Sequence, residues 1–451
     1  MSGLSKARER ILFLTDEGSF TEFGKEVTMR STDFEVSALK EAGDGVVTGY
    51  ATVEGKPVAI YSQDRTVLNG SFGEMHAKKI LNLYEFALKT GMPVIGMLDS
   101  SGVRIEEALD AMEAYGQLYT MKSKASGAIL QIDLVFGRTG GMAAVSAGLS
   151  DFVLMENDAE LFVNAPNAIR GNFEEKLNTA SAAFRAERSG DVDFVGTEDE
   201  MLSCVKELLR ILPENAEEIA LGDSSDDLNR MTPELSGTTS AKTIAKALGD
   251  EQRFLELKDK YAPEIVTGFI ELDGMTTAVV GNETEVLTAA GLRKAADFVR
   301  FADAFGIPLL TLSKGVRLEA EEASEAAFLG ETSAFVSALS SATVPKLNVV
   351  IGDSIGSAGL IMNSKAIGAD VSYAVEGVKI GIMDAKAAKK ILADEAAEAR
   401  FEENQSALEA AKRGFVDEIV SAPSLRKKVL IAMEILSLKR EKPIVKKHAG
   451  K

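Results

Sequence analysis

The sequence predicts an α/β protein made of two similar domains in tandem. Three observations lead to this prediction. The chain has 451 residues, more than one hydrophobic core usually supports. Short apolar runs alternate with amphipathic helical segments, and the same series of segments occurs twice. We place the two domains at 1–225 and 226–451, because Pro, Gly, Ser, Asp and Thr accumulate across 213–240.

Each repeat begins with a strand pattern and continues with a helix. The strand sequence VTGY at 47–50 returns as VTGF at 266–269. Apolar residues at helical spacing then predict helices that end at Gly91 and Gly306, because glycine suits the left-handed position after a helix. The apolar runs that follow, 92–97 and 307–312, predict buried strands.

A glycine-rich turn between a strand and a helix is the third shared block. Gly137 and Gly141 correspond to Gly352 and Gly356, and both pairs are separated by the same length of chain. Such a turn leaves backbone N–H groups unpaired at the positive end of the helix dipole. These groups can bind an oxygen that becomes negative in a transition state. Because the turn recurs at equivalent positions, it is the candidate catalytic element of each half.

Composition excludes several classes of function. The net charge of −19 opposes general binding to nucleic acid or to anionic membranes. No apolar run approaches the ~18 residues of a membrane span, and the first residues show no signal core, so we expect a cytoplasmic protein. The single cysteine, Cys204, excludes an intrachain disulfide and a zinc ribbon. It follows a capping-box pattern, Thr197 with Glu200, and is predicted to pack inside a helix.

Side chains that usually carry catalysis are scarce. The chain has two histidines, and His76 falls on the apolar stripe of a predicted helix, which favours a packing role. No nucleophile elbow, phosphate-binding Walker loop or zinc-binding helix motif is present, and we expect no metal site. If the protein is an enzyme, it contributes oriented donors and shape, while the reacting partners supply the base and the nucleophile.

Several short motifs occur in a fixed order along the chain. They are ARERI at 7–11, DEGSF at 16–20, GEMHA at 73–77, DSSGVRI at 99–105, YAP at 261–263, MNSK at 362–365 and IGAD at 367–370. In this combination they resemble the biotin-dependent acyl-CoA carboxyltransferases. That family includes propionyl-CoA and acetyl-CoA carboxylase beta subunits and the alpha subunits of glutaconyl-CoA and methylmalonyl-CoA decarboxylases.

The resemblance implies a fold, a reaction and partners. It implies two crotonase-like (ClpP/crotonase) ββα spiral domains, with acyl-CoA on the 1–225 side and biotin on the 226–451 side. The reaction would move CO2 between carboxybiotin on a separate carrier protein and the α-carbon of an acyl-CoA. The implied partners are a biotin carboxyl carrier protein and a biotin carboxylase subunit, or membrane decarboxylase subunits. The resemblance also implies a hexamer built from dimers, with the active site between the first domain of one subunit and the second domain of its dimer partner.

Residues of this chain at the family's positions form the expected site. The two oxyanion holes would comprise Gly140, Gly141 and Met142 in the first half, and Gly356, Ser357 and Ala358 in the second. A loop beside the acyl-CoA would contain Ser100, Ser101, Gly102 and Arg104. Contacts to the phosphates or adenine would come from Lys78, Lys79 and Arg138, and the wall of the acyl pocket from Leu360.

Alternative functions stay open at this point. The family usually has Gly-Gly-Ala-Tyr where this chain has residues 356–359, GSAG, so a non-catalytic scaffold subunit is one alternative. The decarboxylase subunit of a sodium pump is another, because the same holes serve either direction. A biotin-independent hydratase or hydrolase would need paired carboxylates, but Glu106 and Glu107 diverge by ~100° on a helix.

Overall fold

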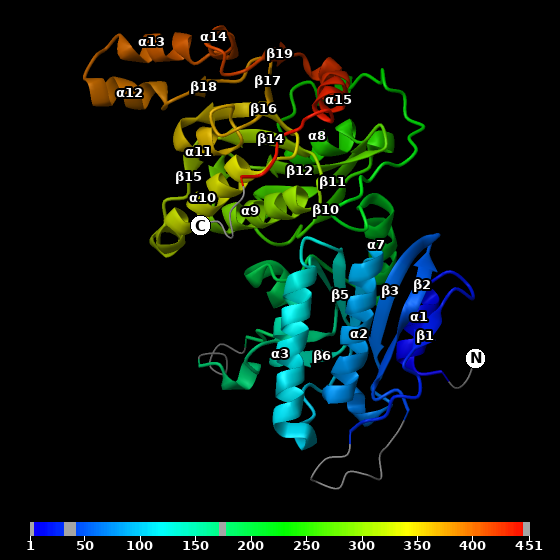
Figure 1. Ribbon diagram of the computed structural model, residues 1–451. Helices are drawn as coiled ribbons and strands as arrows, with labels where there is room; N and C mark the ends of the chain where they lie inside the picture. The colour runs from blue at the N-terminus through cyan, green and yellow to red at the C-terminus, as the bar shows by residue number, and fades with distance from the viewer. Residues whose placement is uncertain (1–3, 31–41, 171–176, 445–451) are drawn as a thin grey trace. The chain divides into compact units, whose positions relative to one another are not determined.

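The computed structural model describes residues 4–30, 42–170 and 177–444, and the chain divides into two compact units, Met1–Glu218 and Ile219–Lys451 (Figure 1). The first unit is built on a seven-stranded sheet with the order β1-β2-β3-β4-β5-β7-β9. These strands are β1 (Thr21–Phe23), β2 (Val46–Val53), β3 (Lys56–Gln63), β4 (Val94–Leu98), β5 (Gln131–Val135), β7 (Phe152–Glu156) and β9 (Phe194–Gly196).

The second unit repeats this order in an eight-stranded sheet, β10-β11-β12-β14-β16-β17-β19, with β18 (Ile380–Gly381) paired to β16. Its other strands are β10 (Leu255–Leu257), β11 (Ile265–Leu272), β12 (Met275–Asn282), β14 (Leu309–Gly315), β16 (Lys346–Ile355), β17 (Val371–Val375) and β19 (Glu418–Val420). Two further two-stranded sheets pair β6 (Arg138–Gly140) with β8 (Glu160–Phe162), and β13 (Val286–Leu287) with β15 (Arg317–Leu318).

Strand pairing is the same in both units. The first three strands are antiparallel, and the remaining main-sheet strands are parallel. Even the register repeats, since Ala59 pairs with Val94 in the first unit and Ala278 pairs with Leu309 in the second. The predicted α/β duplication is therefore confirmed down to individual residue pairs.

Helices cover the sheets and bury one apolar side against them. In the first unit they are α1 (Lys6–Leu14), α2 (Glu74–Thr90), α3 (Ala108–Ala125), α4 (Met142–Ala147), α6 (Ala182–Phe184) and α7 (Glu198–Ile211). In the second they are α8 (Ala241–Leu248), α9 (Ala289–Ala304), α10 (Glu322–Ser341), α11 (Gly356–Ile361), α12 (Ala385–Leu392), α13 (Ala397–Asn404), α14 (Ala407–Lys412) and α15 (Leu425–Leu436).

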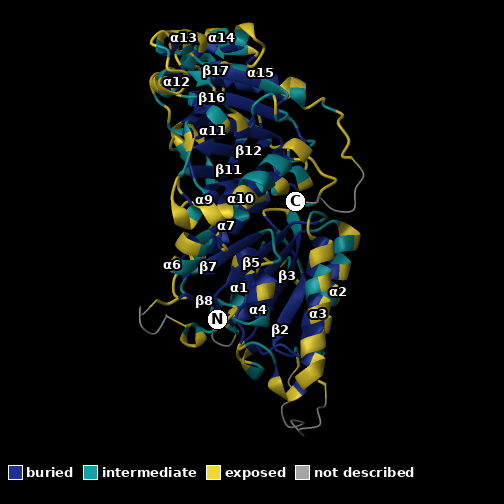
Figure 2. Cartoon of the chain, turned by 90° about the vertical axis from the view of Figure 1, so that its left-hand side faces the viewer, coloured by how far each residue is buried: buried dark blue, intermediate teal, exposed yellow. Residues whose placement is uncertain are grey.

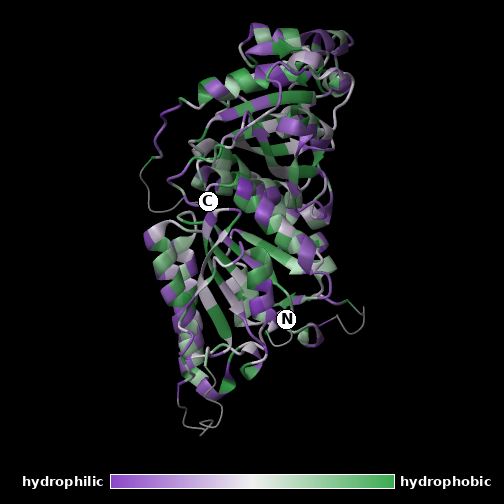
Figure 3. Cartoon of the chain, turned by 90° about the vertical axis from the view of Figure 1, so that its right-hand side faces the viewer, coloured by the Kyte–Doolittle hydropathy of each residue, from purple (hydrophilic) through white to green (hydrophobic). Residues whose placement is uncertain are grey.

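Buried strands and half-exposed helices follow from hydropathy. The strands β3, β5, β11 and β12 are buried along most of their length (Figure 2), and the strands are mainly hydrophobic (Figure 3). Helix α2 ends at Thr90, and Gly91 follows with φ of 72°; Gly306, just after α9, has φ of 65°, as predicted. The predicted capping box of Thr197 and Glu200 begins α7, in which Cys204 is buried.

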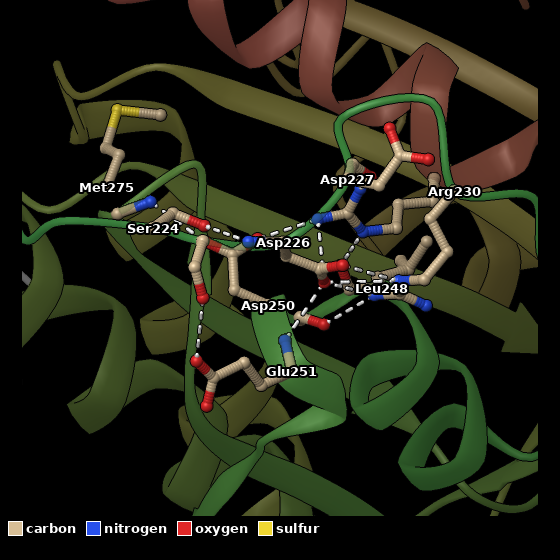
Figure 4. Close-up of polar contacts among 12 residues, drawn as sticks. Ser224, Asp226, Asp227, Arg230, Leu248, Asp250, Glu251 and Met275 are labelled. Carbon is tan, nitrogen blue, oxygen red and sulfur yellow. Dashed lines mark hydrogen bonds and ion pairs between the residues drawn. The ribbon is translucent and has the colours of Figure 1, made fainter.

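An ion-pair cluster fastens the start of the second unit to its own core (Figure 4). Asp226 accepts hydrogen bonds from Arg230 Nη2 at 2.9 Å and from the Glu251 amide at 3.0 Å. The fully buried Arg426 of α15 donates to Asp226 at 3.2 Å and to Asp250 at 2.7 Å. This cluster lies where β11 ends and β12 begins, because Asp250 also accepts from the amide of Gly274 at 2.9 Å.

In the described part of the chain, every helix is too short or too polar to cross a membrane.

Candidate active site

The first glycine turn lies between β5 and α4. Gly141 has φ of 60° and ψ of −122°, a conformation that favours glycine, and its N–H donates to the Phe162 carbonyl at 2.8 Å. At Gly140 a β-carbon would lie 2.5 Å from the Phe162 ring, so a larger residue there would have to displace that ring. The Gly141 amide is thus occupied. The amides of the first turn of α4, beginning with Met142, have no intrahelical carbonyl to bind.

The second glycine turn has the same construction. Gly356, with φ of 62°, begins α11 directly after β16, and a β-carbon there would lie 3.1 Å from the Ile382 carbonyl. Gly359 leaves still less room, because a β-carbon would lie 2.3 Å from Ser354 Oγ. Ser357 is exposed and Ala358 is buried. The first-turn amides of α11 are those of the three residues predicted for the second hole.

A pocket of about 740 Å³ adjoins the second turn, which is within the usual range for a small-molecule site. Its wall is mainly apolar and includes Val350, Leu360, Ile380, Ile382, Phe401 and Phe415. Its polar lining includes Asn348, Ser354, Ser364 and Ser372. In the described chain, the buried Ser364 hydroxyl has no hydrogen-bond partner.

This polar lining was not predicted from the sequence. Asn348 is one polar residue inside the otherwise apolar run LNVVI at 347–351, and that interruption was the available signal. Its amide nitrogen donates to Ser372 Oγ at 3.3 Å, and Thr311 Oγ1 donates to its carbonyl oxygen at 2.9 Å. Asn363 extends the network by donating to Thr311 at 3.0 Å.

The loop after β4 contains the residues predicted to lie beside an acyl-CoA. Ser100 is buried, and its hydroxyl donates to the Gly70 carbonyl at 2.6 Å while accepting from the Gly102 amide at 3.0 Å. Gly102 has φ of 97°, in the left-handed region that favours glycine. Ser101, between them, is exposed. The loop is therefore fixed from inside by Ser100 and can present Ser101 outward.

Arg104 is 3% exposed and occupied by protein partners. Its Nη1 lies 2.7 Å from Glu107 Oε1 and 2.7 Å from Asp44 Oδ1, while its other nitrogens donate to Ser71. Burial raises the pKa of Asp44 to about 6, against the opposing effect of Arg104. His76 is also buried here, its Nδ1 lies 3.0 Å from the Asp44 carbonyl, and burial holds its pKa well below the usual value. Arg104 thus supports the loop from beneath.

The three basic residues predicted for CoA contacts differ in their surroundings. Lys79 is buried, and its Nζ donates to the carbonyls of Gly43, at 2.9 Å, and Val46. Lys78 is exposed, and so is Arg138, which pairs with Glu160 at 3.0 Å. Of the three, Lys78 and Arg138 can reach a ligand, whereas Lys79 is committed to the fold.

Comparisons with known proteins identify the family. The model of the carboxyl transferase domain matches residues 2–450. The chain belongs to the carboxyl transferase domain family. The predicted family is therefore confirmed.

Individual members of the family match this carboxyltransferase over nearly its full length. The propionyl-CoA carboxylase beta chain of Roseobacter denitrificans is 36% identical, covering 99% of this chain and 93% of its own. The methylmalonyl-CoA decarboxylase alpha subunit of Veillonella parvula is 33% identical with the same coverage. The crystal structure of transcarboxylase 12S superposes with a TM-score of 0.94 at 32% identity, covering 98% of this chain and 92% of that one. This similarity confirms the predicted tandem crotonase-like fold.

Proposed function

We propose that this carboxyltransferase moves CO2 between carboxybiotin on a separate carrier protein and the α-carbon of an acyl-CoA. The observation that carries the proposal is the recurrence of one glycine turn at equivalent strand ends in both units. Each turn places first-turn helix amides at the end of the sheet where ligands of α/β proteins bind. Two donor sites suit a reaction that develops negative charge on two carbonyl oxygens, one on each reactant.

The first turn would bind the thioester oxygen of the acyl-CoA as it becomes an enolate. Because the Gly141 amide is bound to Phe162, the donors would be the amides of Met142 and of the residues that follow it in α4. Gly140 would allow the close approach of β8, and Gly141 would allow the left-handed turn. Ser101 would face the thioester, and Lys78 and Arg138 would contact the CoA phosphates, since both are exposed cations.

The second turn and its pocket fit biotin. A mainly apolar wall suits the fused rings and alkyl chain, and the polar groups of the lining suit a urea, which needs both donors and acceptors. The amides of Ser357 and Ala358 would bind the ureido oxygen, and the unpartnered Ser364 hydroxyl is a further donor. Bound biotin would supply the nitrogen that releases CO2 and takes up the α-proton, so no protein base is required. Leu360, half exposed at the rim, would face the acyl chain.

Proline substitutions test the amide donors directly. Met142→Pro removes the N–H at the first helical position, where proline is tolerated, while Met142→Ala keeps it. Ser357→Pro and Ser357→Ala form the matching pair in the second turn. We expect each proline variant to lower kcat about 10²–10³-fold in a carboxyl-transfer assay with methylmalonyl-CoA and biocytin. Wild-type kcat in both proline variants, with an unchanged melting temperature, would reject the proposal.

One observation favours a second candidate function. The second turn has Ser357 and Gly359 where the family usually has glycine and tyrosine, and Gly359 leaves no space for a side chain. A non-catalytic subunit that holds a carrier within a complex would show acyl-CoA binding without turnover in the same assay. The crystal structure of transcarboxylase 12S describes a hexamer, and we propose that copies of this chain also assemble. The same amides would serve carboxylation or decarboxylation.

A further inference from the structure

A carboxylate fills the side-chain space of the first glycine of the first turn. Asp99 directly follows β4, and a β-carbon on Gly137 would lie 2.4 Å from Asp99 Oδ1. Asp99 is 9% exposed. A side chain at Gly137 would have to displace the Asp99 carboxylate, which fills the space between the end of β4 and the end of β5.

Three polar contacts keep Asp99 in place. Arg10 of α1 donates to Asp99 Oδ2 at 2.9 Å in a buried ion pair, and Arg65 lies 3.4 Å from Oδ1. The Asp99 amide donates to Gln63 Oε1 at 3.1 Å. The guanidinium of Arg10 also lies 3.9 Å from the ring centre of Phe136, the residue before Gly137. Arg10 therefore connects α1 to the residues that directly follow β4 and β5.

In the second unit a lysine takes the place of the aspartate, and its aliphatic stem lies beside the glycine. Lys314 stands at the position of the second repeat that corresponds to Asp99, and a β-carbon on Gly352 would lie 3.0 Å from Lys314 Cβ. The Lys314 amide donates to Asn282 Oδ1 at 3.2 Å, as the Asp99 amide does to Gln63. Its Nζ donates to the Thr239 carbonyl at 2.6 Å, just before α8. In both units, therefore, a side chain fills the space beside the glycine and is linked to the helix at the start of the unit or to the residues just before it. The two side chains differ in charge.

We propose that Asp99 and Lys314 are positioning residues, each fixing the glycine turn whose helix amides bind the developing negative charge. This inference rests on the proposed function. Only a short stretch of chain joins Gly137 to Met142, and an equally short one joins Gly352 to Ser357. A shift of the glycine backbone would therefore also move the donor amides. Misplacement of a catalytic group by about 1 Å can cost ~100-fold in rate.

Paired substitutions separate positioning from general stability. Asp99→Ala removes the carboxylate beside Gly137, and Lys314→Ala removes the Cγ and Cδ atoms that lie beyond Cβ beside Gly352. Asp99→Asn and Lys314→Met keep most of the side-chain volume. In the methylmalonyl-CoA and biocytin assay, we expect kcat to fall about 10–100-fold in the alanine variants, with KM for both substrates nearly unchanged. The asparagine and methionine variants should recover most of that loss. If the two residues only stabilise the fold, an alanine variant and its volume-keeping partner with equal melting temperatures should have equal kcat.

Asp250→Ala is the matched control. It breaks a buried ion pair with Arg426. This pair is in the same unit as Lys314, but Asp250 contacts the residue before β12 and Lys314 contacts the last residue of β12. This variant should lose thermal stability and keep its kcat below the melting range. If the alanine variants at 99 and 314 behave like Asp250→Ala, the inference is wrong. If they do so while Met142→Pro and Ser357→Pro lose activity, the proposed function stands without it; active proline variants overturn both.

Discussion

The two units share one scaffold but differ beneath their glycine turns. In the first, Asp133 of β5 pairs with Lys122 at 2.5 Å and accepts from the Tyr61 hydroxyl at 3.0 Å, all three buried. The equivalent position in the second unit is the uncharged Asn348, which lines the pocket. A closed ion pair and an open pocket thus occupy the same place in the fold. The second unit therefore has a pocket where the first unit has a buried ion pair.

The largest expected effect comes from breaking the buried ion pair. Asp133→Asn removes the ion-pair partner of the fully buried Lys122. We expect it to lower the free energy of unfolding by about 3–5 kcal/mol, measured by urea denaturation. Asn348→Ala, at the equivalent position beside the pocket, should cost about 1–3 kcal/mol. Equal losses at both positions would contradict the contrast between the units.

A buried lysine common to both units gives a pH dependence. Lys79 and Lys294 occupy equivalent positions of the two repeats, and Lys294 Nζ donates to the carbonyls of Lys258, Tyr261 and Ile265 at 2.7–2.8 Å. Burial lowers the pKa of both lysines to about 8 from 10.5. Between these two pKa values the unfolded chain holds more protons, so this contribution to stability rises with pH. It shrinks as the pH falls from 10.5 and is absent below about 8.

Replacing one of these lysines should remove its contribution to the rise of stability with pH. We expect the free energy of unfolding of Lys294→Met to change less between pH 8 and 10 than that of the wild type, by about 2–3 kcal/mol. The exposed Lys78, changed to methionine, serves as the control and should keep the wild-type slope. An unchanged slope in Lys294→Met would show that the lysine stays charged throughout.

Equivalent valines should respond differently to a larger side chain. Val135 of β5 is fully buried in the core, whereas Val350 of β16 lines the pocket. Val135→Phe overpacks the core and should cost about 1–3 kcal/mol in unfolding free energy. Val350→Phe should cost less stability but raise KM for biocytin, because the ring enters the pocket. A normal KM in Val350→Phe would argue against biotin in this space.

The smallest effect concerns how the equivalent helices α2 and α9 begin. At α9, Thr288 Oγ1 accepts from the Gly291 amide at 2.9 Å. At α2 the matching residue is Gly73, and the remote Glu107 accepts from the Glu74 amide at 2.6 Å instead. Thr288→Ala should cost about 1 kcal/mol. Gly73→Ser should not stabilise the protein, because its β-carbon would lie 2.5 Å from Glu107 Oε1.

The sequence by itself determined the α/β class, the duplication, the glycine turns and the family. These are local or repeated patterns: strand and helix periods, the glycines after α2 and α9, and motif blocks in a fixed order. The capping box at Thr197 could also be predicted from the sequence, because its partner Glu200 lies one helical turn further along the chain. Such features need no knowledge of distant contacts.

Only the tertiary structure decided which polar groups are available to a ligand. Lys79, Arg104 and the Gly141 amide are ordinary donors in the sequence, yet residues from distant parts of the chain occupy them. The same holds for the pocket, whose lining comes from 348 to 416. A hydrogen bond satisfies a donor wherever its acceptor stands in the chain, so occupancy and burial are properties of the folded molecule and cannot be read from local sequence.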